Sequence, residues 1–195
     1  NLMEREMLKH QKKYFNTFSL KHQLLLALNL NFTNQQAAAI ATLLPILKKK
    51  HDDIESVLDI HLCLIMFYFQ KHEFKKALGI FSKFYHTDKW YIEKAGIDWV
   101  LKKSLTEILL HIELKNIDLV ESRVLSFKRN YYQYLKDTNQ QRAITFIELA
   151  MQVYKNPENI TTETFRKTIK TSFEWVGPKK EDIFIMSFYA WLKSK

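Results

Sequence analysis

The adjacent pair His51-Asp52 has the residue types that bind a catalytic metal ion. An imidazole nitrogen and a carboxylate oxygen are common metal ligands, and His22 and Asp98 are candidates for the remaining ligands. The pair follows three lysines at the expected start of a helix, however, and no apolar run precedes it. At such a position an aspartate accepts hydrogen bonds from the free backbone N–H groups of the first turn. Capping of the helix by Asp52 or Asp53 is therefore the favoured interpretation.

The other pairs of metal-ligand type have the wrong spacing to share an ion. Residues two apart on a helix point to different faces, which separates His61 from Cys63 and His111 from Glu113. His72 has no second histidine four positions along, so it does not form a zinc-protease motif. We therefore expect no catalytic residues, no bound metal and no cofactor, and a protein that is not an enzyme.

The formal charge of +9 raises nucleic acid as a partner, because cations that neutralise phosphates give sequence-independent affinity. Of the 30 basic residues, however, 25 are lysines, whereas phosphate recognition favours the guanidinium group of arginine. One aromatic and basic cluster has tyrosines that can stack on bases, although their helical spacing is more typical of buried rings. The cluster consists of Lys128, Arg129, Tyr131, Tyr132 and Tyr134. A basic helical nucleic-acid-associated protein is thus the alternative function.

The composition indicates an all-α protein. Only three glycines and three prolines occur in 195 residues, which disfavours barrels, sandwiches and glycine-rich phosphate loops. One cysteine excludes an intramolecular disulfide framework, and no apolar stretch has the length of a membrane span. We expect a single cytoplasmic domain over residues 1–195. Because the chain begins with Asn1 rather than Met, we also expect a trimmed start, and the domain can be the C-terminal part of a longer protein.

A polar residue followed by an apolar one recurs every 42 or 43 residues between amphipathic stretches. Such self-similarity is typical of stacked helical repeats. The four occurrences are Asn31-Phe32, Glu73-Phe74, Asn116-Ile117 and Asn159-Ile160. Apolar residues at three- and four-residue steps predict helix pairs around them. We expect these pairs at 3–29 with 34–49, 53–70 with 74–86, 90–114 with 118–137, and 139–155 with 161–175, followed by a final helix near 181–193. Pro45 is expected to kink its helix or to start its last turn.

The second helix pair resembles a tetratricopeptide repeat (TPR). Its matching positions are Leu64, Tyr68, Phe74, Ala77 and Phe81. The match departs from the family at Ile65, His72, Phe84 and Lys89, and the period is longer than the family's 34 residues. The chain thus resembles degenerate TPR-like helical proteins of an uncharacterised bacterial type. The resemblance implies a right-handed α-solenoid of about four hairpins plus a C-terminal helix, acting as a scaffold that binds a protein or peptide.

The same resemblance implies that a partner lies in a concave groove lined by the first helices of the pairs. Transferred residue by residue, the groove residues are Asp59, Leu62, Met66, Phe69, Lys102, Leu105, Leu109 and Ile112. A helix or an extended apolar peptide would suit this strip. The alternative is that these side chains pack against neighbouring helices, because apolar stripes at helical spacing are usually core.

The last helix is apolar on nearly every side, whereas the end of a solenoid needs a polar outer face. Phe184, Phe188 and Trp191 are therefore a candidate surface for a partner or for a homodimer. Insertion of this helix into the chain's own groove is the alternative. A weaker resemblance of His51-Asp52 to HD-type metal-dependent phosphohydrolases implies metal-assisted hydrolysis, and it is retained as the weaker alternative function.

Overall fold

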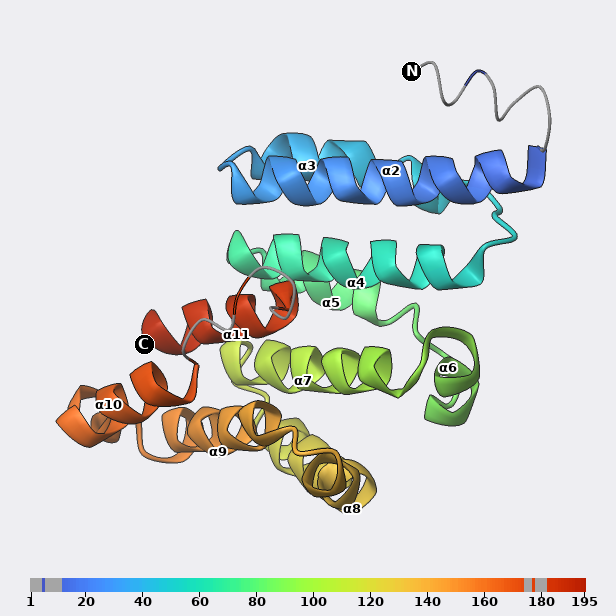
Figure 1. The fold of residues 1–195 in the computed structure, drawn as a ribbon. Coiled ribbons are helices and arrows are strands. Elements are labelled where there is room, and N and C mark those ends of the chain that lie inside the picture. The colour runs from blue at the N-terminus through green and yellow to red at the C-terminus, as the bar shows by residue number, and fades with distance from the viewer. Residues whose placement is uncertain (1–4, 6–11, 174–176, 178–181) are drawn as a thin grey trace. The chain divides into compact units, whose positions relative to one another are not determined.

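All regular structure in the described part of the chain is helical, as the composition predicts. The computed structural model describes residues 5, 12–173, 177 and 182–195 (Figure 1). These residues form ten α-helices and two short 3-10 helices and contain no strand. None of these helices combines the length and the apolar character needed to cross a membrane. The all-α fold is confirmed, and the right-handed solenoid stays a prediction.

The chain forms two compact units, Asn1–Val100 and Leu101–Lys195. The boundary between them falls within helix α7, which runs from Ile97 to Glu113. The expected single repeat domain over residues 1–195 stays a prediction.

The first unit is built from helix pairs around α4. Helix α2 packs against α3 and α4, and α4 also packs against α5 and α6 (Figure 1). Because α4 has neighbours on several sides, it is buried around most of its circumference, and residues 62–69 are all buried. The elements of this unit are α2 (Lys12–Phe32), α3 (Gln36–Leu43), the 3-10 helix η1 (Ile46–Lys48), α4 (Ile54–Gln70), α5 (Phe74–Phe81) and α6 (Asp88–Ala95).

The second unit has its core around α9. Helix α9 packs against α8, α10 and α11, and α10 also packs against α11. Phe146 and Ile147 of α9 are buried, as are Phe188 and Leu192 of α11. Besides the greater part of α7, the elements are α8 (Ile117–Asp137), α9 (Gln141–Lys155), the 3-10 helix η2 (Pro157–Thr161), α10 (Glu163–Ser172) and α11 (Ile183–Lys193).

Four joints between consecutive helices share one backbone conformation. In each, a residue with φ between 54° and 62° follows the helix, and the next residue donates its N–H to the carbonyl five positions back, over 2.8–3.0 Å. This pattern is the Schellman motif, which satisfies the last carbonyls of a helix and reverses the chain within about three residues. The residues with positive φ are Asn34, His72, Lys115 and Asn139.

The predicted repeat phrase is confirmed at two of these joints. Glu73-Phe74 and Asn116-Ile117 lie directly after the residue with positive φ. The phrase is also confirmed at Asn159-Ile160, which lies between α9 and α10 within η2. The prediction is wrong at Asn31-Phe32, which still belongs to α2. The phrase did not mark the joint at Asn139, which connects α8 to α9.

Two predicted helices are interrupted. The helix expected at 34–49 ends at Leu43, and Pro45 then precedes η1 because proline has no N–H for the helical ladder. The helix expected at 90–114 is divided into α6 and α7 by Gly96, whose φ of 84° suits glycine. The expected helical residues 3, 4, 6–11, 174, 175 and 181 lie outside the described residues.

Candidate functional site

The predicted groove residues on α4 lie in the core of the first unit. Leu62, Met66 and Phe69 are each at most 5% exposed, and Asp59 is half-buried. A ligand can reach the three apolar side chains only after neighbouring helices move. Packing in the core is the alternative that the sequence also supports, and a groove at these positions stays a prediction.

The predicted groove residues on α7 are placed similarly. Leu105 and Leu109 are buried, and Ile112 is half-buried. The ammonium group of Lys102 pairs with the Asp182 carboxylate at 2.6 Å. The same group lies 5.5 Å from the ring centre of Phe184, so Lys102 is held at the beginning of α11.

Phe188 and Trp191 of α11 are covered by the chain itself, whereas Ile183 and Met186 are exposed. Phe188 is 2% exposed and stacks on Phe146 of α9, with ring centres 4.8 Å apart. Trp191 is 7% exposed, and its indole N–H donates to the Glu113 carboxylate at 2.5 Å. Phe184 is half-buried. A partner or dimer surface made of these residues stays a prediction, and it requires α11 to leave α9.

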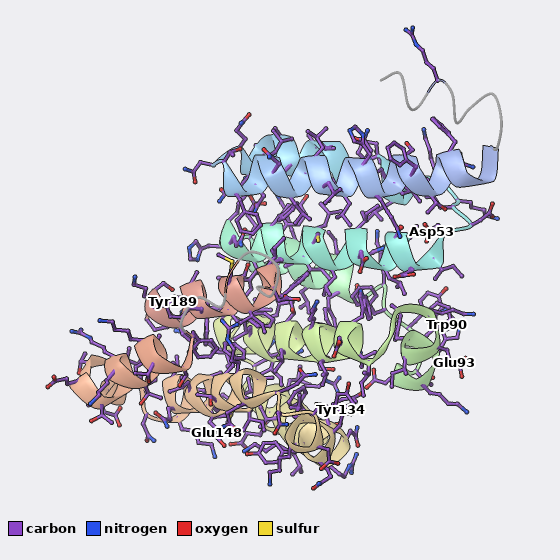
Figure 2. All side chains as sticks on the ribbon, viewed as in Figure 1. Asp53, Trp90, Glu93, Tyr134, Glu148 and Tyr189 are labelled. Atoms are coloured by element: carbon purple, nitrogen blue, oxygen red, sulfur yellow. The ribbon has the colours of Figure 1, made fainter. Side chains whose placement is uncertain are left out.

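The pair His51-Asp52 lies where the helix-cap interpretation expects it, and Asp53 is the capping residue. The Asp53 carboxylate accepts from the backbone N–H of Ser56 at 3.1 Å and from the Ser56 hydroxyl at 2.8 Å (Figure 2). Asp52 is exposed, and the His51 ring donates to the Ile46 carbonyl at 2.9 Å. In the part of the chain that the structure describes, no three His, Cys, Asp or Glu side chains lie close enough to hold a metal ion.

Tyr131 and Tyr132 of the aromatic and basic cluster on α8 are engaged in contacts within the protein. Tyr131 is buried and contacts Phe127, with ring centres 5.6 Å apart. The Tyr132 hydroxyl donates to the Glu148 carboxylate of α9 at 2.9 Å, which raises the pKa of that tyrosine. Lys136 lies 4.8 Å from the Tyr132 ring centre. The bases of a nucleic acid would therefore have to displace contacts that join α8 to α9.

A solvent-accessible cavity of about 560 Å³ lies among η2, α10 and α11 in the second unit. We call it the α10–α11 pocket. This volume falls within the roughly 300–1,000 Å³ of typical ligand sites. Apart from Thr161 and Ser194, its described lining is of two kinds. The apolar and aromatic lining residues are Ile160, Phe165, Ile169, Tyr189 and Leu192, and the cationic ones are Arg166, Lys170, Lys193 and Lys195.

Local sequence explains how α10 separates these two kinds of side chain. Thr162 caps the helix by accepting from the N–H of Phe165 at 3.3 Å. Phe165 and Ile169 are four apart and share the buried face. Arg166 and Lys170, each one position later, are exposed at the edge of that face.

Helix α11 supplies the facing side of the α10–α11 pocket. Tyr189 is half-buried and stacks on Phe173, with ring centres 5.7 Å apart, so its ring is fixed (Figure 2). Leu192 is buried and Lys193 is exposed. Both helices therefore contribute an apolar floor and a cationic edge.

The positive charge of the α10–α11 pocket is largely unneutralised. Arg166, Lys170 and Lys193 make no ion pair with any described residue, whereas Lys195 pairs with Glu113. Among the described lining residues there is no aspartate or glutamate. The nearest acidic residues along the described chain, Glu158 and Glu163, lie outside it.

No family model, curated protein or solved structure matches this chain. The TPR-like resemblance therefore stays a prediction. The function is inferred from the geometry of the described residues.

The sequence pattern alone does not predict the α10–α11 pocket. Four-residue spacing on α10 indicates the part of the lining that this helix supplies. It places Phe165 with Ile169 on one face and Arg166 with Lys170 beside it. The other part comes from Tyr189 and Lys193, and no pattern within either helix reports that the two helices pack together.

Proposed function

We propose that the protein is a non-enzymatic interaction module that binds a short acidic, amphipathic segment of a partner protein in the α10–α11 pocket. The observation that carries the proposal is an apolar floor edged by three cations that pair with no described residue, in a lining whose described members include no acidic side chain. The TPR-like resemblance supports the same class of function, because that family implies peptide or protein binding.

The two parts of the lining have different roles in this proposal. Apolar side chains of the partner, spaced three or four apart on a helix, bury surface against Phe165, Tyr189 and Leu192 and supply most of the affinity. Partner carboxylates meet Arg166, Lys170 and Lys193. Because these cations are exposed, each pair contributes only about 0–1 kcal/mol, and the charges mainly set orientation and association rate.

The binding test uses three fluorescein-labelled peptides and fluorescence anisotropy. The first is helix-forming, with acidic and leucine residues on adjoining faces; the second has the same composition scrambled; the third replaces each acidic residue by lysine. We expect only the first to bind, because only it matches both the apolar floor and the charge. Equal binding of the lysine peptide or of the scrambled peptide would contradict the proposal.

A pair of charge variants localises the binding. The double variant Arg166→Glu with Lys170→Glu is expected to weaken binding of the first peptide by about tenfold or more, since two attractions become repulsions. The matched control is Lys167→Glu, because Lys167 is exposed on the same helix and does not line the pocket. Circular dichroism melting checks that both variants fold. An equal loss of affinity in the Lys167→Glu control would show that the peptide does not bind specifically in the α10–α11 pocket, which would contradict the proposal.

A further inference from the structure

A second cavity, of about 260 Å³, lies in the first unit between α4 and the segment 83–91. We call it the aromatic pocket. Helix α4 contributes Ile54, Val57, Leu58 and His61. The remaining lining residues are Lys49, His51, Lys83, Phe84, Tyr85, His86, Trp90 and Tyr91. No acidic side chain is among them.

The aromatic residues divide into a buried group and an accessible group. Tyr91 stacks on Trp99 with ring centres 5.2 Å apart, and both are buried. The ring of the exposed His86 stacks on that of Trp90, with ring centres 3.9 Å apart, and its centre lies 4.3 Å from that of the Tyr85 ring. Trp90 is labelled in Figure 2. Tyr85 is 81% exposed. An aromatic ring this exposed, at the edge of a cavity, is available to stack on a ligand.

Two cations stand at the aromatic pocket without partners of opposite charge. Lys49 and Lys83 are exposed, and neither makes an ion pair with any residue that the structure describes. Because the described lining holds cations and no acid, the aromatic pocket favours an anionic ligand. A quaternary ammonium ion, which aromatic cages can bind, would be repelled by these lysines.

His61 adds a hydrogen-bond acceptor to the lining. Its Nδ1 donates to the Val57 carbonyl at 2.8 Å, so the proton of the neutral ring lies on that nitrogen. Burial, together with the nearby Lys83, lowers the pKa of His61 even though the bond to Val57 opposes this shift. At neutral pH Nε2 is therefore an acceptor, and none of the described residues donates to it.

We propose that the aromatic pocket binds one purine nucleotide, with the base between the apolar side chains of α4 and the accessible aromatic residues. The volume of the aromatic pocket suits one purine base without its sugar and phosphate. It lies below the roughly 300–1,000 Å³ of sites that enclose a whole drug-sized ligand. The sugar and phosphate then lie outside, where Lys49 and Lys83 pair with the phosphate. An amino group of the base can donate to His61. The nucleotide comes either free or within a single strand, and this site goes beyond the proposed function.

Calorimetric titration of the full chain with AMP, adenosine and inorganic phosphate tests the composition of the site. We expect AMP to bind, adenosine to bind about tenfold more weakly because it lacks the charge, and phosphate alone not to bind detectably. Absence of AMP binding at millimolar concentration, or phosphate binding as tight as that of AMP, overturns the proposal.

Variants assign the binding to the aromatic pocket. The double variant Lys49→Glu with Lys83→Glu is expected to weaken AMP by about tenfold and to leave adenosine unchanged. Tyr85→Ala is expected to weaken both ligands about tenfold through lost stacking. Because Tyr85 is so exposed, this variant is expected to fold, and melting curves check it. The control Lys94→Glu, exposed on α6 and outside the lining, is expected to change neither ligand. Equal losses in the control overturn the assignment.

A five-nucleotide oligoadenylate separates the two sources of the nucleotide. Binding at least about tenfold tighter than AMP assigns the site to single strands, since further phosphates meet Lys48 and Lys50 beside Lys49. Equal affinity per molecule assigns it to the free nucleotide. If the proposal is right, Tyr85→Ala weakens the binding of oligoadenylate in either case. The peptide-binding test uses variants in the second unit, whereas the nucleotide titrations use variants in the first. Failure of one proposal therefore leaves the test of the other unaffected.

Discussion

At the scale of single residues, Asp53 illustrates a polar side chain whose role is structural. Its carboxylate accepts a hydrogen bond from the backbone N–H of Ser56 in the first turn of α4. The first unit packs around this helix. Burial raises the pKa of Asp53, but the hydrogen bonds from Ser56 and Thr17 and the charge of Lys21 outweigh it and hold the pKa below its ordinary value of 3.8. The charged form is therefore favoured by folding.

Replacing Asp53 by alanine is expected to lower the free energy of unfolding by about 1 kcal/mol at pH 7, through loss of the cap. Because the folded pKa is lowered, the charge-dependent part of this contribution is present above pH 3.8 and is lost as the pH falls through the folded pKa. Urea unfolding of both proteins at pH 7 and near pH 3 measures the effect. The difference between them should shrink at the lower pH. Asp52→Ala, at an exposed position without a capping role, is the control, and an equal loss there would contradict the assignment of the cap.

At the scale of helices, the α4–α5 hairpin buries a small residue, Ala77, in its second helix. Ala77 is fully buried, and α5 packs directly on α4. We expect Ala77→Leu to lower the free energy of unfolding by about 1–3 kcal/mol, because the larger side chain forces the helices apart. Lys76→Leu adds a similar apolar side chain at an exposed position and should cost much less. Chemical denaturation compares the two, and equal effects would show that close approach at Ala77 is not required.

The accuracy of the sequence predictions also differs between helices for physical reasons. Helices α4 and α8 lie within one residue of their predicted bounds, because strong apolar periodicity is reinforced by an end signal. The break at Gly96 was not predicted, since apolar spacing continues on both sides of it. The TPR-like resemblance implied an apolar strip that includes Leu62 and Leu105, but apolar spacing does not distinguish a groove from a core. That distinction depends on packing between helices, as does the α10–α11 pocket.

At the scale of the whole molecule, the excess of positive charge distinguishes the proposed peptide binding from the nucleic-acid alternative. The net charge of +9 comes mostly from lysines, and exposed lysines attract any polyanion at low salt. The α10–α11 pocket adds an apolar floor, which salt does not screen. The two kinds of binding should therefore respond to salt differently.

We expect the acidic amphipathic peptide to lose about tenfold or less in affinity between about 50 and 200 mM NaCl, because three exposed cations face it. Duplex DNA held by six or more phosphate contacts would lose about a thousandfold over the same range. Anisotropy titrations of both ligands give the slopes of log affinity against log salt. The peptide slope should become shallower in the Arg166→Glu, Lys170→Glu double variant and stay unchanged in Lys167→Glu. A peptide slope as steep as that of DNA would mean that charge alone holds the peptide, and it would favour the nucleic-acid-associated function.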